Sequence, residues 1–301
     1  MSKDVEFQEK RDSMIHDSES NEVWLSPWIE DEFPDIFSGL KKILEDNNIA
    51  CKMIPYTNDL WCRDYMPIQI DESRYICYTY RPDYLLKRAT DIAFITDSHK
   101  VSRQMQLNAK HTDIVIDGGN IVKVGNYIIM TEKVFAENPQ YDHSSLCREL
   151  ENLFECDFLF LPWDKKEKYG HSDGIVKAIT DDTVLMTNYA DFDYHMAEEM
   201  EKRLSAIFNV EKLHYDCPKK DLRSWAYINF LTVGNLIVVP QLHSEYDEQA
   251  MAQIEKYYPH CTITQLDATR SVKAGGGLNC ISWCRKNEEL QNNIILNHHK
   301  L

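Results

Sequence analysis

Four short segments of the sequence carry side chains that could do chemistry together. Residues 61–64 end in Arg and Asp, 117–120 read Asp-Gly-Gly-Asn, 170–174 read Gly-His-Ser-Asp-Gly, and 275–280 hold three glycines followed by Leu, Asn and Cys. These segments contain seven of the ten glycines of the chain. Because glycine lets the backbone approach another group closely, this concentration predicts one shared site at the junctions of loops and strands.

Cys280 is the candidate nucleophile of this site. It follows a glycine-rich loop that can expose a thiol and direct backbone N–H groups toward it. A free thiol is largely protonated at pH 7, so its activation requires a neighbouring cation, an acid–base group or a bound cationic substrate. The alternative is a buried and inert cysteine, the role that suits most of the other eight.

His171 and Asp173 are separated by one residue, so both side chains point to one face if Asp173 begins a strand. A histidine can act as general acid or base near neutral pH, while Asp173 could bind a cation or orient the imidazole. Other histidines, His111 and His243 among them, fit ordinary core or surface roles. A His-x-Asp fragment also occurs in metal sites, but no second metal-ligand spacing accompanies it, so no metal is predicted.

Asp64 directly follows Arg63, and taken alone it would be an ordinary ion-pair or turn carboxylate. Together with Asp173, a thiol and a histidine it has a more specific meaning. Two carboxylates match a planar cation with several N–H donors, such as a guanidinium group. The glycine run has neither the GxxxxGK[ST] nor the GxGxxG spacing, so nucleotide binding is not predicted.

The amino-acid composition narrows the class of protein to which this chain can belong. The 301 residues are 43% hydrophobic and 27% charged, as in a globular protein. The formal charge of -16 disfavours nucleic acid and suits a small cationic substrate. No apolar run approaches a membrane span, no signal peptide is recognisable, and nine scattered cysteines suit a reducing compartment. We therefore expect a cytoplasmic protein without a membrane or nucleic-acid partner.

The elements that position the four segments recur along the chain. Helices are predicted over 35–47, 144–154, 194–208 and 247–257. Hairpins are predicted at the turns 125–126, 181–182 and 234–235. Strands are predicted over 174–179 and 227–233, and a final strand from about Leu278. The unit of strand, hairpin, helix and strand repeats every 50 to 60 residues or so. The chain therefore reads as one closed α/β domain of ββαβ units over 22–301, after a poorly ordered or peripheral lead-in over 1–21.

In this order, the four segments resemble the agmatine deiminase and bacterial-type peptidylarginine deiminase family. The resemblance rests on Trp61-x-Arg63-Asp64, Asp117-Gly-Gly-Asn120, Gly170-His171-x-Asp173 and Gly-Gly-Gly-x-Asn279-Cys280, with Tyr227-Ile-Asn229-Phe230 and Val239-Pro240 also similar. It spans about residues 61–282. It implies a pseudo-fivefold α/β propeller, the pentein fold, in agreement with the repeated units.

The resemblance also implies roles for single residues. Cys280 would attack the guanidinium carbon, His171 would protonate the departing ammonia, and Asp64 and Asp173 would bind the guanidinium. Water would then hydrolyse the covalent thiouronium intermediate to a ureido product, without metal or organic cofactor. The remaining motif residues are implied to bind substrate: Trp61, Arg63, Asp117, Asn120, Gly276 and Asn279.

The substrate is less constrained than the family. Asp117 stands where agmatine deiminases usually have Glu, Gly174 where they have Asn, and their glutamine run after the cysteine is missing. These differences resemble the peptidylarginine branch, but enzymes that modify protein arginine are typically exported. We therefore expect deimination of agmatine to N-carbamoylputrescine and ammonia, a step of putrescine biosynthesis.

Three alternatives stay open beside agmatine deimination. They are a peptidyl- or free-arginine deiminase that produces citrulline, an amidinotransferase on the same fold, and a non-catalytic guanidine-binding protein. The last is disfavoured because binding alone has no use for Cys280 with His171. The oligomeric state is not determined, and a homo-oligomer is among the possibilities.

Overall fold

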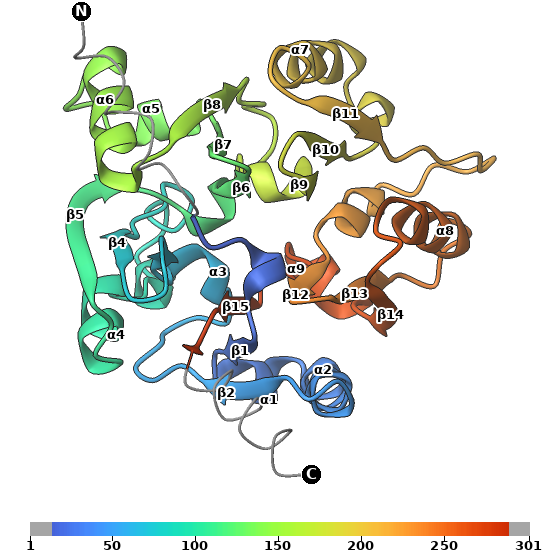
Figure 1. The fold of residues 1–301 in the computed structure, drawn as a ribbon, viewed down its shortest axis with the longest axis horizontal. Coiled ribbons are helices and arrows are strands. Elements are labelled where there is room, and N and C mark those ends of the chain that lie inside the picture. The colour runs from blue at the N-terminus through green and yellow to red at the C-terminus, as the bar shows by residue number, and fades with distance from the viewer. Residues whose placement is uncertain (1–13, 289–301) are drawn as a thin grey trace, which may run out of the picture.

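The computed structural model describes residues 14–288, which form five three-stranded sheets around a central axis (Figure 1). The sheet orders are β15-β1-β2, β3-β4-β5, β6-β7-β8, β9-β10-β11 and β12-β13-β14. In every sheet the middle strand pairs antiparallel with the first strand named and parallel with the last. The predicted pseudo-fivefold α/β propeller, the pentein fold, is confirmed.

The strands are β1 (Glu22–Leu25), β2 (Ala50–Met53), β3 (Ile68–Gln69), β4 (Tyr75–Thr79), β5 (Ala109–Val115), β6 (Val122–Val124), β7 (Tyr127–Thr131), β8 (Asp157–Leu161), β9 (Val176–Thr180), β10 (Thr183–Met186), β11 (Asn209–Lys212), β12 (Leu231–Val233), β13 (Leu236–Gln241), β14 (Thr262–Asp267) and β15 (Ser282–Arg285). The α-helices are α1 (Trp28–Glu32), α2 (Pro34–Asp46), α3 (Cys62–Tyr65), α4 (Ser98–Gln104), α5 (Lys133–Glu137), α6 (His143–Phe154), α7 (Tyr194–Leu204), α8 (Asp247–Tyr257) and α9 (Thr269–Ala274). The 3-10 turns are η1 (Asp17–Glu19), η2 (Asp91–Phe94), η3 (Gly118–Asn120), η4 (Ser172–Gly174), η5 (Tyr189–Asp191) and η6 (Ser224–Ile228).

One helix in each unit carries the chain from the middle strand to the parallel third strand. These helices are α2, α4, α6, α7 and α8, and they lie on the outside of the ring (Figure 1). A parallel pair needs such a crossover, because a tight turn cannot reverse the chain direction twice. In α2 the residues Ile36, Leu40 and Leu44 recur every four positions and are buried, which is the helical spacing from which this helix was predicted.

The ring closes by pairing the two ends of the described chain. β15 lies antiparallel to β1, with Ser282 opposite Leu25 and Arg285 opposite Glu22. The first unit thus takes its antiparallel strand, the one nearest the ring axis, from the C-terminal end (Figure 1). As a result, the loop that precedes β15 is equivalent in space to the segments that precede β3, β6, β9 and β12.

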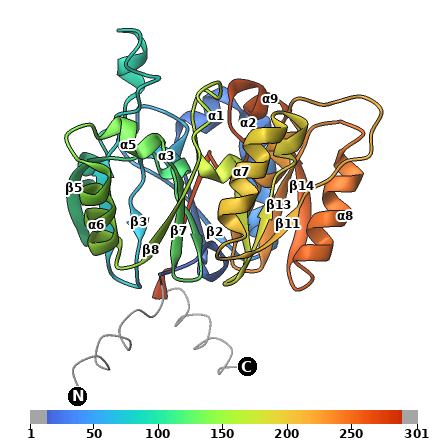
Figure 2. The same cartoon turned by 90° about the horizontal axis from the view of Figure 1, so that it is seen from above.

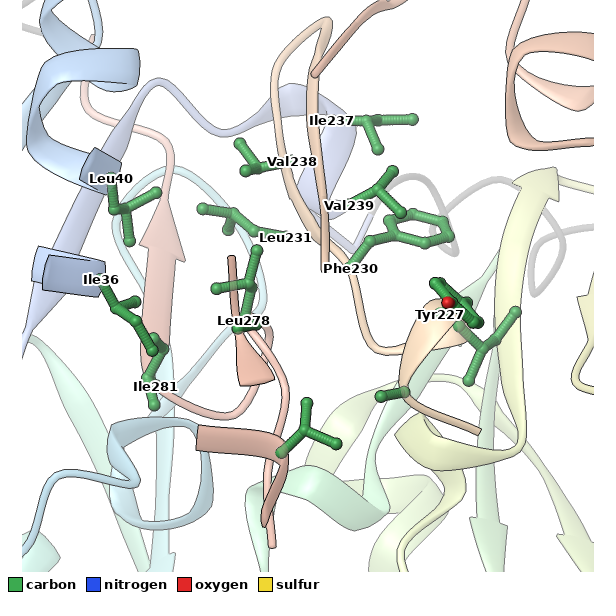
Figure 3. Packing of buried hydrophobic residues seen from close by; sticks show 14 of the residues in the cluster. Ile36, Leu40, Tyr227, Phe230, Leu231, Ile237, Val238, Val239, Leu278 and Ile281 are labelled. Carbon is green, nitrogen blue, oxygen red and sulfur yellow. The ribbon is translucent and has the colours of Figure 1, made fainter. Parts of the chain in front are cut away.

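A large apolar cluster anchors the loop that holds Cys280. Leu278 and Ile281, on either side of that loop's cysteine, are fully buried in a cluster with Ile36 of α2 and Leu231 of β12 (Figure 3). Ile228 and Phe230 are buried in the same cluster and flank Asn229. Core packing on both sides of a polar residue fixes where that residue can point.

Three sequence predictions of strand position are corrected by the structure. The segment predicted as a strand over 227–233 is the turn η6 followed by the shorter strand β12, and the final strand begins at Ser282 rather than near Leu278. Similarly, Gly174 belongs to η4 and not to β9. A short buried apolar run has the same pattern in a turn as in a strand, so periodicity could not distinguish them.

The expected lead-in over 1–21 is described only from residue 14 onward. Met14 and Ile15 are buried, and Asp17 in η1 lies 3.7 Å from the guanidinium of Arg63. Residues 14–21 therefore pack against the domain rather than trailing from it, because buried apolar side chains and an ion pair hold them. No helix in the part of the chain that the structure describes is long and apolar enough to cross a membrane.

Candidate active site

The segment before the first strand of each unit ends near the axis of the ring. α3 carries Asp64, η3 directly follows Asp117, η4 carries Asp173, η6 ends at Asn229, and the loop after α9 ends at Cys280. α3 contacts η3, η3 contacts η4, and η4 contacts η6. Figure 2 shows α1 and α9 at one end of the ring, and the pocket described next lies at that end.

One cavity of about 870 Å³ is lined by all four side chains predicted to be catalytic: Cys280, His171, Asp64 and Asp173. Cys280, Asp64 and Asp173 are buried, and only 9% of the His171 side chain is exposed. The structure thus brings together residues that are far apart in the sequence, and it excludes most water from them. Electrostatic interactions are stronger in such a site than in solution.

The Cys280 thiol lies against two polar groups. Its Sγ donates to Asn229 Oδ1 at 3.2 Å and is 3.8 Å from Asp173 Oδ2. Burial raises the pKa of Cys280 well above its ordinary value, and the charges of Asp173 and Asp64 raise it further. The thiol is therefore protonated in the free site, and a bound cation would be needed to favour the thiolate.

His171 is held between two carboxylates. Its Nε2 lies 3.0 Å from Asp117 Oδ2, and its Nδ1 lies 3.7 Å from Asp64 Oδ1. Burial alone lowers the pKa of His171, but the carboxylates of Asp64 and Asp117 outweigh burial and raise it to about 9. The imidazole is therefore protonated at neutral pH and can act as a general acid.

Gly119 makes this close arrangement possible. A Cβ at this position would lie 2.5 Å from His171 Nδ1 and 2.7 Å from Asp64 Oδ1, which is too close for any side chain. The Gly119 N–H also donates to Asp64 Oδ1 at 3.1 Å. The glycine pair of residues 117–120 thus brings backbone against the site, as the sequence predicted.

Asp64 and Asp173 are buried carboxylates without a strong cationic partner. Among residues 14–288, the only ion pair that involves either one is the long contact of Asp64 with His171. Burial raises the pKa of Asp64 to about 7, while His171 opposes that rise. Isolated buried charges are costly, so two such carboxylates facing one pocket form a site that can accept a cation.

Trp61 lines the cavity, whereas Gly276 lies against the Trp61 ring and is not a lining residue. The indole occupies the space where a side chain on Gly276 would lie. Gly276 therefore allows the indole to pack over the Cys280 loop.

Like Gly276, the other four residues expected to bind substrate do not line this cavity, which corrects that expectation. Asp117 lies behind His171 and is bound by Lys133 at 3.2 Å, and Asn279 contacts Asp173 instead of the cavity. Asn120 exchanges hydrogen bonds with the Thr131 backbone. Arg63 pairs with Asp17 on the side of the ring away from the cavity. All four are buried polar side chains that contact other protein groups, although Arg63 Nη2 and Asp117 Oδ1 have no hydrogen-bond partner among the described residues.

Sequence reasoning assigned no role to three residues that support the site. Asn229 accepts from the Cys280 thiol, Lys133 binds Asp117, and Lys177 binds Asn279 at 2.9 Å. Internal repetition could have identified Asn229, because it precedes the first strand of the fifth unit as Asp173 precedes the first strand of the fourth. A lone lysine carries no comparable signal in the sequence.

Comparison with known proteins places this site in a family. Residues 30–284 match the family model described as Porphyromonas-type peptidyl-arginine deiminase. The agmatine deiminase of C. jejuni superposes with a TM-score of 0.73 at 19% identity, covering 90% of this chain and 95% of that one. The agmatine deiminase of Enterococcus faecalis also gives 0.73 at 19% identity, over 91% and 95% of the two chains.

A more distant likeness shows how widely the fold is shared. An amidinotransferase from Microseira wollei superposes with a TM-score of 0.57 at 13% identity, over 91% of this chain and 96% of that one. The fold alone therefore does not decide the reaction. The family-model match covers most of the sequence, and on that basis the chain belongs to the Porphyromonas-type peptidyl-arginine deiminase family, hydrolases that act on guanidino groups.

Proposed function

We propose that this protein is a deiminase that hydrolyses a small guanidino compound, agmatine in the first place, through a covalent thiouronium intermediate on Cys280. One observation carries the proposal. A cysteine, a protonated histidine and two buried carboxylates without a Lys or Arg counterion line the same cavity. A Cys-to-Ser variant of the C. jejuni agmatine deiminase has been solved with substrate bound, which supports a cysteine of this kind as the reacting group.

Substrate binding comes first in the proposed mechanism. The guanidinium lies between Asp64 and Asp173 and donates charge-assisted hydrogen bonds to both. Its positive charge offsets the two carboxylates that raise the pKa of Cys280. The thiol can then lose its proton to solvent, so the nucleophile forms only when substrate is present.

Two chemical steps follow. The Cys280 thiolate attacks the guanidinium carbon, a C–S bond forms, and the C–N bond breaks as His171 gives its proton to the departing ammonia. The neutral His171 then takes a proton from a water molecule that attacks the thiouronium carbon. The C–S bond breaks and returns its electron pair to sulfur, and the new hydroxyl group loses its proton to solvent, which leaves a ureido product and a free thiolate.

The charges around the cavity favour a substrate without a free carboxylate. Among the described residues no arginine lines the cavity, and its lysines are Lys166 and Lys168. Lys166 is bound to Asp193 at 3.0 Å, and the Lys168 ammonium lies 4.7 Å from the ring centre of Tyr169. Acidic side chains also line the rim, at Glu32, Asp59, Asp164 and Glu167. An amine at the far end of the substrate suits these charges better than the carboxylate of free arginine.

Peptidylarginine is the second candidate substrate. Phe94 and Leu222 line the cavity with 48% and 71% of their surfaces exposed, and Trp28 is 44% exposed beside them. Exposed apolar side chains around an opening can contact a polypeptide on either side of the modified arginine. The description of the matched family supports this alternative.

An ammonia-release assay tests the proposal and separates the alternatives. Agmatine, arginine, arginyl peptides and methylated guanidines are compared without any added acceptor amine, with Cys280→Ser as control. We expect release from agmatine with the highest kcat/KM, and none with the variant. Ammonia release from arginyl peptides alone would show that the substrate is peptidylarginine and not agmatine. Turnover that requires an acceptor amine would make the protein an amidinotransferase, and no turnover of any guanidine would overturn the proposal.

A further inference from the structure

A second cluster of reactive side chains lies outside the active site, in the unit built from β3, β4 and β5. Cys77 on β4 is the register partner of His111 on the parallel strand β5. Register partners in a sheet direct their side chains to the same face. His99 belongs to α4, which packs on β4, and its Nε2 lies 3.4 Å from the Thr79 hydroxyl of that strand.

The three side chains come close enough to share one ion. The Cys77 sulfur and one nitrogen from each histidine all lie within 4.8 Å of one another. The Nδ1 atoms of His99 and His111 are 2.7 Å apart, and the two rings are stacked. A tetrahedral zinc ion with bonds of about 2.3 Å to sulfur and 2.0–2.1 Å to nitrogen separates its ligand atoms by roughly 3.3–3.6 Å. Small side-chain rotations would therefore complete the geometry.

Burial changes steadily across the cluster. Cys77 is fully buried, His99 is partly buried and His111 is exposed. An ion could therefore reach the thiol from solvent past the imidazoles, and a water molecule could occupy the fourth position. A neutral imidazole has the lone pair that a metal ligand needs.

From this arrangement we propose that Cys77, His99 and His111 form a binding site for a thiophilic divalent cation of the zinc type, separate from the active site. Binding releases the Cys77 proton, because a coordinated thiol is deprotonated. It also replaces the hydrogen bond between the two imidazoles with two bonds to the metal. The ion would connect α4 to both parallel strands and stabilise this unit by mass action. The ligands are dispersed at positions 77, 99 and 111, which is why no spacing motif identified them.

The test uses the full chain carrying Cys280→Ser, so that the active-site thiol cannot bind the metal. After treatment with a chelator, Zn²⁺ binding is titrated by calorimetry, and Co²⁺ is added in parallel to follow its absorption spectrum. His111→Gln removes an exposed ligand, and His195→Gln on α7, where the side chain is 93% exposed, is the matched control.

We expect one equivalent of Zn²⁺ to bind the parent and the His195 control, and to bind the His111 variant at least about tenfold more weakly. Co²⁺ should give a thiolate-to-metal absorption band that Cys77→Ser lacks, and Zn²⁺ should raise the Tm of the parent but not that of His111→Gln. Equal affinity in parent and His111→Gln, or bound Co²⁺ without a thiolate band in the parent, would overturn the site. If Cys77→Ser does not fold, the affinity of His111→Gln relative to the parent and the Co²⁺ spectrum of the parent still test whether the site binds metal.

Discussion

The side-chain amide of Asn279 donates to Asp173 Oδ2 at 2.8 Å, while its carbonyl oxygen accepts from Lys177 Nζ at 2.9 Å. The lysine can only donate, so it fixes which end of the amide faces the carboxylate. Asp173 is thereby oriented by a neutral group and keeps its charge for a substrate. Lys177 itself lies 4.0 Å from Asp17, which connects the active-site carboxylate to the opposite end of the ring.

Asn279→Ala should lower kcat/KM about ten- to a hundredfold, because a hydrogen bond to a buried charge contributes roughly 1.5–3 kcal/mol. The larger part should appear in KM, since Asp173 would lose its orientation for binding the guanidinium. Steady-state kinetics with the preferred guanidine measure this, with the exposed Asn209→Ala as control. If KM and kcat of Asn279→Ala both matched those of the control, Asn279 would have no positioning role.

Asp64→Asn and Asp173→Asn keep the side-chain shape but remove the charge that faces the guanidinium. We expect each to lower kcat/KM at least about ten- to a hundredfold, and the double variant to be inactive. A cationic substrate analogue should accelerate alkylation of Cys280 by a neutral reagent in the wild type and lose that effect in either variant. Near-wild-type kinetics in one variant would identify that carboxylate as purely structural.

Cys280→Ser should abolish turnover and leave the fold intact, because a serine hydroxyl ionises far less readily than a thiol. The matched control is Cys147→Ser on α6, outside the cavity, which should keep wild-type activity. Activity is measured as ammonia release, and folding by thermal unfolding. Retention of more than about a tenth of the wild-type kcat would exclude Cys280 as the nucleophile.

The pH dependence of kcat/KM should be bell-shaped. Activity should rise through about pH 7, where Asp64 ionises, and fall above about pH 9, where His171 loses the proton it must donate. Asp117 raises the pKa of His171, so Asp117→Asn should lower that pKa and move the falling limb to lower pH. Glu137→Gln changes another partner of Lys133 and should shift the falling limb of the pH profile less than Asp117→Asn does. An unmoved limb in Asp117→Asn would show that His171 does not control it.

A strong chelator should leave ammonia release unchanged. The proposed chemistry uses only the side chains of the cavity, and the proposed ion at Cys77, His99 and His111 lies outside it. The assay is run below the unfolding temperature of the chelator-treated protein, so that a loss of stability is not mistaken for a loss of chemistry. Inactivation by chelator with recovery on added metal would mean that the reaction requires a metal.

The repeated architecture and the four side chains that line the cavity could be predicted without any coordinates. Ile36, Leu40 and Leu44 lie on one face of α2 because their spacing matches the helical period, and the same local rule predicted α6. The types of Cys280 and His171, each beside glycines, limited the chemistry to a nucleophile with an acid–base partner. These inferences depend on neighbours within a few residues, so no tertiary contact was needed to make them.

Which motif residues face the cavity, and which ones support them from behind, depends on contacts between the units of the ring. Asp117 is in the same motif as Gly119, but its carboxylate contacts His171 from behind, whereas Gly119 contacts Asp64 through its backbone N–H. Asn229 meets Cys280 because the ring brings the fifth unit beside the strand that closes the first. Cys77, His99 and His111 converge through strand register and helix packing. Such contacts join residues distant in sequence, and no local pattern encodes the direction in which each side chain points.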